Sequence, residues 1–144
     1  MSPLARLLLG LAGSAAIGCG GPTVAPQPVS AATFTAIYPL MFPRSTKGQC
    51  NLCHSLPPNQ KSNGKLSVGA DRAAAYAALV GTTSTSLDCS GKAYLVPGKP
   101  DESLLLTKLA SPSCGDRMPL GGEPLPEDQL RMIRSWIAAG AQDN

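Results

Sequence analysis

The residues with the clearest chemical potential lie in one run of five, Cys50-Asn51-Leu52-Cys53-His54. This run has the C-x-x-C-H pattern by which one haem is attached covalently to a polypeptide. Two thiols one helical turn apart can add to the two vinyl groups of a porphyrin, and the next histidine can bind the iron as proximal axial ligand. A redox pair of cysteines has no use for that histidine. His54 is the only histidine of the chain, so the pattern predicts one covalent haem c on Cys50 and Cys53.

Residues 1–18 have the composition of a bacterial export signal. Arg6 is their only charged residue, the apolar run 7–12 follows it, and small residues continue to Gly18. The apolar run is shorter than the roughly 20 residues that span a membrane. The alternative, a buried N-terminal helix, does not suit the glycines and prolines that follow. Because haem is attached to C-x-x-C-H outside the bacterial cytoplasm, we expect an exported, periplasmic protein.

The end of this signal is similar to a lipobox, the site where bacterial lipoproteins are cleaved and acylated on a cysteine. Its residues are Ala16-Ile17-Gly18-Cys19, and leucine is more usual in place of Ala16. Lipidation at Cys19 would anchor the protein to a membrane, since each acyl methylene buried in the bilayer contributes about 0.8 kcal/mol to the free energy of membrane binding. Gly20 stands where an aspartate retains many lipoproteins at the inner membrane, which favours the outer membrane. The alternative is ordinary cleavage near Gly18, which leaves a free thiol in an oxidising compartment.

The five cysteines divide into three groups under this interpretation. Cys19 takes lipid, and Cys50 and Cys53 take haem, so Cys89 and Cys114 remain for a disulfide in an oxidising compartment. In the chain-entropy model, a disulfide that closes this loop of about 25 residues stabilises the folded state by roughly 3–4 kcal/mol. A rival interpretation is a zinc site formed by the last four cysteines. It leaves the histidine of the motif without a role, and the second pair lacks C-x-x-C spacing.

Residues 19–32 contain three prolines and no charge, which predicts a lipidated N-terminus with a flexible linker. Residues 33–144 are then one small haem domain. Without Arg6 the mature chain has 11 basic and nine acidic residues, a net charge of +2 that two haem propionates would nearly cancel. No nucleic-acid-binding pattern is present.

Charge is unevenly distributed along the mature chain. No acidic residue precedes Asp71, whereas four basic residues do: Arg44, Lys47, Lys61 and Lys65. One explanation is a solvated surface. The other is a basic rim near the haem that steers an acidic redox partner protein.

Apolar spacing and helix-end residues predict an all-α domain of about four or five helices with long loops around the haem. The expected helical segments are 33–42, a helical turn at the haem motif, 70–80, 100–109 and 126–139. Gly81 and Gly140 are expected to end two of them. No segment alternates like a strand.

With His54 used and no second histidine, the candidates for the sixth iron ligand are a methionine, a lysine or an open site. Met41 is too close to the motif, and core packing explains Met132 in the last expected helix. Met118 follows in a loop, 64 residues after His54. A thioether on iron raises the reduction potential and favours electron transfer. The alternatives are that Met118 only packs against the porphyrin edge, and that Arg117 either pairs with a propionate or is merely exposed.

Three later runs carry a resemblance to a known family. They are residues 97–105, Met118-Pro119 and Trp136-Ile137-Ala138-Ala139-Gly140-Ala141. Together with C-x-x-C-H and in this order, they make residues 33–141 similar to a small class I c-type cytochrome domain of the planctomycete and myxobacterial type.

This resemblance implies haem c on Cys50 and Cys53, His54 and Met118 as axial ligands, and terminal helices that cross near the haem. The insertion that carries the other two cysteines departs from a minimal cytochrome c, so the chain path to Met118 is not set by the family pattern. The expected function is electron transfer by a membrane-anchored mono-haem cytochrome rather than catalysis, because no residue stands out as a catalytic acid or base. The alternatives are a gas-binding or peroxidase-like haem protein with an open distal site, and a binding module that haem stabilises.

Overall fold

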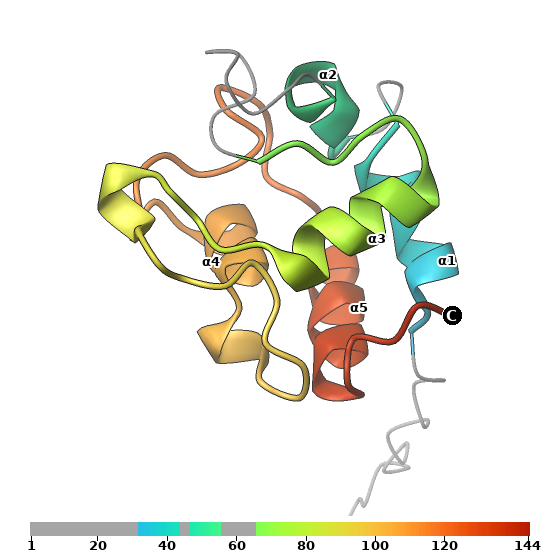
Figure 1. The fold of residues 1–144 in the computed structure, drawn as a ribbon. Helices are drawn as coiled ribbons and strands as arrows, with labels where there is room; N and C mark the ends of the chain where they lie inside the picture. The colour runs from blue at the N-terminus through green and yellow to red at the C-terminus, as the bar shows by residue number, and fades with distance from the viewer. Residues whose placement is uncertain (1–31, 44–46, 56–65) are drawn as a thin grey trace, which may run out of the picture.

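The computed structural model describes residues 32–43, 47–55 and 66–144 (Figure 1). The expected signal, Cys19 and nearly all of the linker lie outside the described residues. The described part is helical and contains no strand, which confirms the all-α prediction for that part. None of its helices is long and apolar enough to cross a membrane. Its elements are α1 (Phe34–Met41), α2 (Cys50–His54), α3 (Arg72–Gly81), η2 (Leu87–Cys89), η3 (Pro100–Glu102), α4 (Leu104–Ala110) and α5 (Glu127–Ala138).

Helix α1 confirms the helix expected over 33–42. It begins at Thr33, whose Oγ1 accepts a hydrogen bond from the Ala36 N–H at 3.1 Å. Pro39 lies inside the helix and on its exposed side. The helix therefore tolerates the lost N–H of Pro39 because its other face, with Phe34 and Ile37, is buried in the core.

Helix α3 confirms the helix expected over 70–80, although it begins two residues later and ends one residue later. Asp71 Oδ1 accepts a hydrogen bond from the Ala74 N–H at 2.8 Å and caps the helix. Gly81, expected as the stop, is instead the last helical residue. The helix ends because Thr82 is extended and its carbonyl accepts a hydrogen bond from the Tyr94 N–H at 3.2 Å.

The single helix expected over 100–109 is wrong, since the structure divides this region into η3 and α4. Ser103 lies between them in an extended conformation and is fully buried. Its Oγ accepts a hydrogen bond from the Val96 N–H at 2.9 Å, and the N–H of Leu104 donates to the Ala93 carbonyl at 3.0 Å. Tertiary hydrogen bonds therefore replace the intrahelical bonds that a continuous helix would need.

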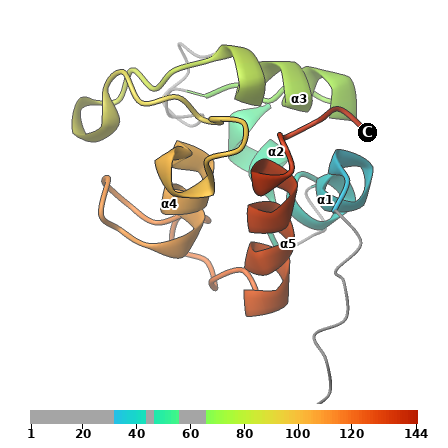
Figure 2. The same ribbon diagram turned by 90° about the horizontal axis from the view of Figure 1, so that it is seen from below.

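Helix α5 lies at the centre of the packing, between α4 and α1, with α3 across them (Figure 2). It confirms the helix expected over 126–139, and its buried face contains Ile133, Trp136 and Ile137. Gly140, with φ +104, follows this helix as expected. Five of the six aromatic residues meet where α1, α3 and α5 approach one another: Phe34, Tyr38, Phe42, Tyr76 and Trp136.

The residues after α5 close over this aromatic cluster. The Trp136 indole N–H donates to the Gln142 carbonyl at 2.8 Å, and the Tyr76 hydroxyl donates to the Ala141 carbonyl at 2.9 Å. The Thr35 N–H donates to the Asn144 carbonyl at 2.8 Å. Segments from both ends of the described chain are thereby fixed to one core. The side chain of Cys50, the first residue of α2, packs against the same core.

Candidate haem-attachment site

Helix α2 is the helical turn expected for the C-x-x-C-H motif, and it consists of the motif alone. Cys50 and Cys53 both carry free thiols, three residues apart and so about one turn apart. The Cys50 side chain is partly buried against the hydrophobic core, whereas Cys53 is exposed. Residues three apart on a helix share a face, so the two thiols lie on the same side of a short helix whose Cys50 side chain packs against the core.

Just before α2, Gly48 lies against the end of α1. Gly48 is buried, and a Cβ at this position would lie 2.3 Å from the Met41 carbonyl oxygen. Gln49 follows in the left-handed region with φ 48°, and the Asn51 N–H then donates to the Phe42 carbonyl at 2.9 Å. Only glycine allows this approach, so Gly48 is what seats the motif against the end of α1.

The ring of His54 is held in one orientation by the backbone. Its Nδ1 lies 3.0 Å from the Leu66 carbonyl oxygen, and because a carbonyl only accepts, Nδ1 must carry the proton. In the neutral imidazole Nε2 then keeps its lone pair, which is the form that binds a metal. The Val68 N–H donates to the His54 carbonyl at 2.7 Å, so the segment 66–68 holds this residue by both its backbone and its ring.

Burial raises the pKa of the Cys50 thiol to about 12, because desolvation penalises the thiolate more than a backbone hydrogen bond favours it. A pKa this high keeps the Cys50 side chain an uncharged thiol at neutral pH.

Met118 lies in the segment between α4 and α5, half-buried against the same hydrophobic core that Cys50 contacts. This segment, orange in Figure 1, rises to the end of the molecule where α2 lies. Within the described residues, no hydrogen bond or ion pair joins Met118 to α2. Met41 is fully buried in the core, in keeping with the interpretation that it is not a ligand.

The Arg117 side chain has a structural role, hydrogen bonding to the backbone, that the sequence does not indicate. Its guanidinium donates to the Met118 carbonyl at 3.2 Å and to the Gly122 carbonyl at 2.7 Å. This side chain therefore braces the turn that follows Met118, and it is only partly exposed.

Cys89 and Cys114 form a disulfide in the structure, with 5.6 Å between their Cα atoms, the pairing that the cysteine count predicts. Disulfide sulfurs are not thiolate ligands, so this pairing contradicts the four-cysteine zinc site. No group of three or more histidine, cysteine or acidic side chains that could hold a metal ion is found among the described residues.

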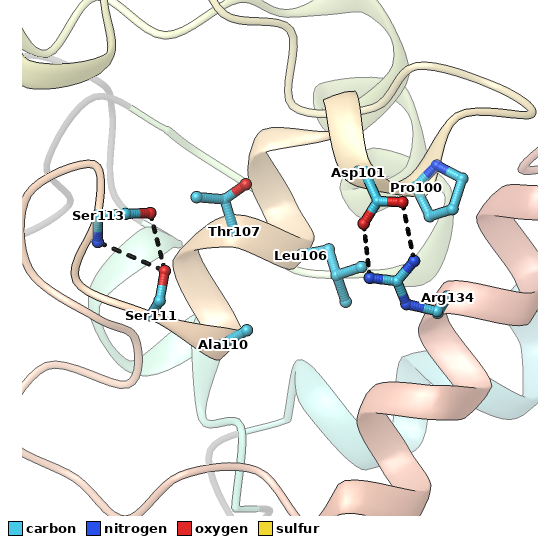
Figure 3. Close-up of a pocket in the computed structure, with 8 residues that line it drawn as sticks. All are labelled: Pro100, Asp101, Leu106, Thr107, Ala110, Ser111, Ser113 and Arg134. Carbon is cyan, nitrogen blue, oxygen red and sulfur yellow. Dashed lines mark hydrogen bonds and ion pairs between the residues drawn. The ribbon is translucent and has the colours of Figure 1, made fainter.

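Two shallow grooves follow α4 and α5, with volumes of about 180 and 260 Å³. Figure 3 shows the first, where the Arg134 guanidinium binds both carboxylate oxygens of Asp101 at 2.7 and 3.1 Å. None of the residues expected to bind haem lines either groove. The sequence gives no signal for this ion pair, because its partners are 33 residues apart.

Comparison with protein-family models, with curated proteins and with solved structures finds no match to this chain.

Proposed function

We propose that this protein is a mono-haem c-type cytochrome that transfers electrons outside the bacterial cytoplasm. One observation carries the proposal. The C-x-x-C-H motif forms a helical turn with two free thiols, and the Leu66 carbonyl fixes the His54 tautomer so that Nε2 is free to bind iron.

When bound, the haem would supply reversible one-electron chemistry at its iron. Cys50 and Cys53 would hold it through thioethers, and His54 and Met118 would be its axial ligands. The rest of the chain orients these groups. The Leu66 carbonyl fixes the imidazole ring, Gly48 lets the chain before α2 approach the end of α1, and the hydrophobic core packs against Cys50.

The location and partners follow from the sequence features already described. We propose that residues 1–18 are removed on export and that acylated Cys19 anchors the domain to a membrane, with the outer membrane favoured. The partners are redox proteins. Lys47, which is exposed beside the motif, belongs to the basic set that would attract an acidic partner.

The decisive experiment produces the full chain in a bacterium that matures c-type cytochromes and asks whether haem remains attached after denaturation. We expect covalent haem in the wild type, loss of one thioether in Cys53→Ala, and loss of covalent haem in the Cys50→Ala/Cys53→Ala double variant. The double variant Cys89→Ala/Cys114→Ala is the matched control and should retain covalent haem. A wild-type chain without covalent haem would contradict the proposal.

The spectrum and potential of the matured protein separate electron transfer from its competitors. A reversible midpoint potential with six-coordinate low-spin iron supports an electron carrier. High-spin iron that binds carbon monoxide when reduced would instead favour a haem protein with an open distal site.

A further inference from the structure

The segment that carries Met118 is attached to one residue of α4 from two directions. The Lys108 ammonium donates hydrogen bonds to the Cys114 carbonyl at 2.7 Å and to the Asp116 carbonyl at 2.9 Å. The Lys108 carbonyl accepts the N–H of Met118 at 2.7 Å. A single residue thus fixes the chain just before Met118 and the backbone of Met118 itself.

The sequence explains why the Lys108 carbonyl is available. In a continuing helix this carbonyl would accept the N–H of residue 112, four positions on. Residue 112 is proline, which has no N–H, and α4 ends at Ala110. The orphaned carbonyl at the helix end is satisfied by Met118 instead.

The start of the segment is tied down independently. The disulfide joins Cys114 to Cys89, and Gly115 turns the chain with φ +72°. A Cβ on Gly115 would lie 2.8 Å from an Asp88 carboxylate oxygen and 3.3 Å from the Lys108 ammonium. The ammonium therefore lies close to a turn whose positive φ at Gly115 favours glycine.

We propose that Lys108 is the positioning residue for Met118: its ammonium and its carbonyl fix the course of residues 114–118 and so hold the thioether in place. The benefit of this arrangement to iron ligation rests on the proposed function, whereas the hold of Lys108 on the segment does not. The ammonium is suited to the task because one cation with three donors can satisfy two carbonyls that point to the same place.

The test compares the matured full-length wild type with Lys108→Gln, Lys108→Arg and the control Lys92→Gln. Lys92 is exposed, so its replacement removes the same charge elsewhere. Hydrogen exchange of the Met118 amide is measured by NMR, together with the weak thioether–iron band near the red end of the oxidised spectrum. In Lys108→Gln the Met118 N–H keeps its bond to the carbonyl of residue 108, whereas the two hydrogen bonds of the ammonium are lost. We expect about tenfold faster exchange of this amide, because the segment before it opens more often, and a weaker band. Lys108→Arg should retain much of the protection, and Lys92→Gln should match the wild type.

Unchanged exchange in Lys108→Gln, or equal changes in Lys108→Gln and Lys92→Gln, would overturn the proposal. If Lys108→Gln does not fold, amide exchange in the wild type tests the proposal instead. A wild-type Met118 amide that exchanges as fast as the amide of exposed Leu120 would overturn the proposal. A wild type with covalent haem but no thioether band would remove Met118 as ligand, and the exchange data would still decide whether Lys108 fixes the segment. The two failures are therefore distinguishable.

Discussion

The ring of Phe34 stacks on the indole of Trp136, with 5.1 Å between the ring centroids and 26° between the planes. This contact joins α1 to α5, and both side chains are buried to 99% or more. Gly48, just before α2, lies against Met41 at the end of α1, so the stack fixes part of the support on which the C-x-x-C-H motif rests. The first and last helices of the described part are thus in contact.

We expect Trp136→Ala to lower the free energy of unfolding by about 3–5 kcal/mol, because it removes the stack and leaves a cavity in the core. The indole N–H that binds the Gln142 carbonyl is also lost. Urea unfolding of the matured protein measures the change. Leu87→Ala is the control, since Leu87 is 98% exposed and its truncation should change the free energy by less than about 0.5 kcal/mol. Similar effects of both variants would contradict the assigned core.

Gly48→Ala tests the close turn before the haem motif. Its Cβ would approach the Met41 carbonyl to 2.3 Å, and backbone atoms give way only at a cost, so we expect a loss of about 1–3 kcal/mol in stability. Gly81→Ala is the matched control, because nothing lies within 4 Å of its Cβ. That variant should be neutral or stabilising by up to about 1 kcal/mol. Thermal unfolding of both proteins separates a steric effect from a general effect of added side chains.

Local sequence patterns are sufficient to predict α1 and α5 because those helices combine a periodic apolar face with clear end residues. They fail between 100 and 109, where the N–H groups of Leu104 and Leu105 donate to the carbonyls of Ala93 and Tyr94 instead of to carbonyls of a continuous helix. The Ser103 hydroxyl fixes this break, because it accepts the Val96 N–H. The haem motif is readable because its chemistry needs particular side chains at fixed spacing. The Leu66 carbonyl, which orients His54, has no sequence signature, since every residue carries a carbonyl.

For the same reason, the contacts of Lys108 with the segment before Met118 cannot be predicted from the sequence. A lysine in the last turn of a helix is ordinary, and only the fold shows that Pro112 releases its carbonyl and that two other carbonyls converge on its ammonium. The sequence predicts Met118 as the loop methionine, and the structure places it half-buried on the core. Its ligation of iron remains a prediction.

Met118→Ala should retain covalent haem, since attachment depends on the two thiols, but should lose the thioether–iron band and lower the reduction potential. Met132→Leu is the control. Met132 is also half-buried against the core, on α5, and its replacement should leave the band in place. Oxidised and reduced visible spectra with a redox titration make the measurement. A band that survives in Met118→Ala would identify a different sixth ligand.

Removal of the disulfide should reduce the stability of the domain by roughly 3–4 kcal/mol, the chain-entropy value for a loop of 25 residues. The double variant Cys89→Ala/Cys114→Ala is compared with the wild type by denaturant unfolding, and the wild type in reductant should match the variant. A loss far below 1 kcal/mol would contradict this prediction and would mean that the unfolded chain without the disulfide already keeps residues 89 and 114 close together.

The ion pair between Asp101 and Arg134 predicts a defined pH dependence. Hydrogen bonding to the Arg134 guanidinium, and then its charge, hold the pKa of the Asp101 carboxyl below its ordinary value of 3.8. A lowered folded-state pKa means that the pair contributes stability above pH 3.8 and loses it as the pH falls through the lower folded value. Because the Asp101 side chain is 80% exposed, we expect this contribution to be small.

Carbon-13 NMR of the Asp101 carboxyl should show a titration midpoint below 3.8 in the wild type, and Arg134→Gln should return it towards that value. Arg131→Gln is the matched control, because Arg131 lies one turn away and its nearest carboxylate, that of Glu127, is 3.8 Å distant. It should leave the Asp101 midpoint where it is. A midpoint that shifts equally in both variants would mean that longer-range attraction to both arginines of α5, rather than the bidentate pair, lowers the pKa of Asp101.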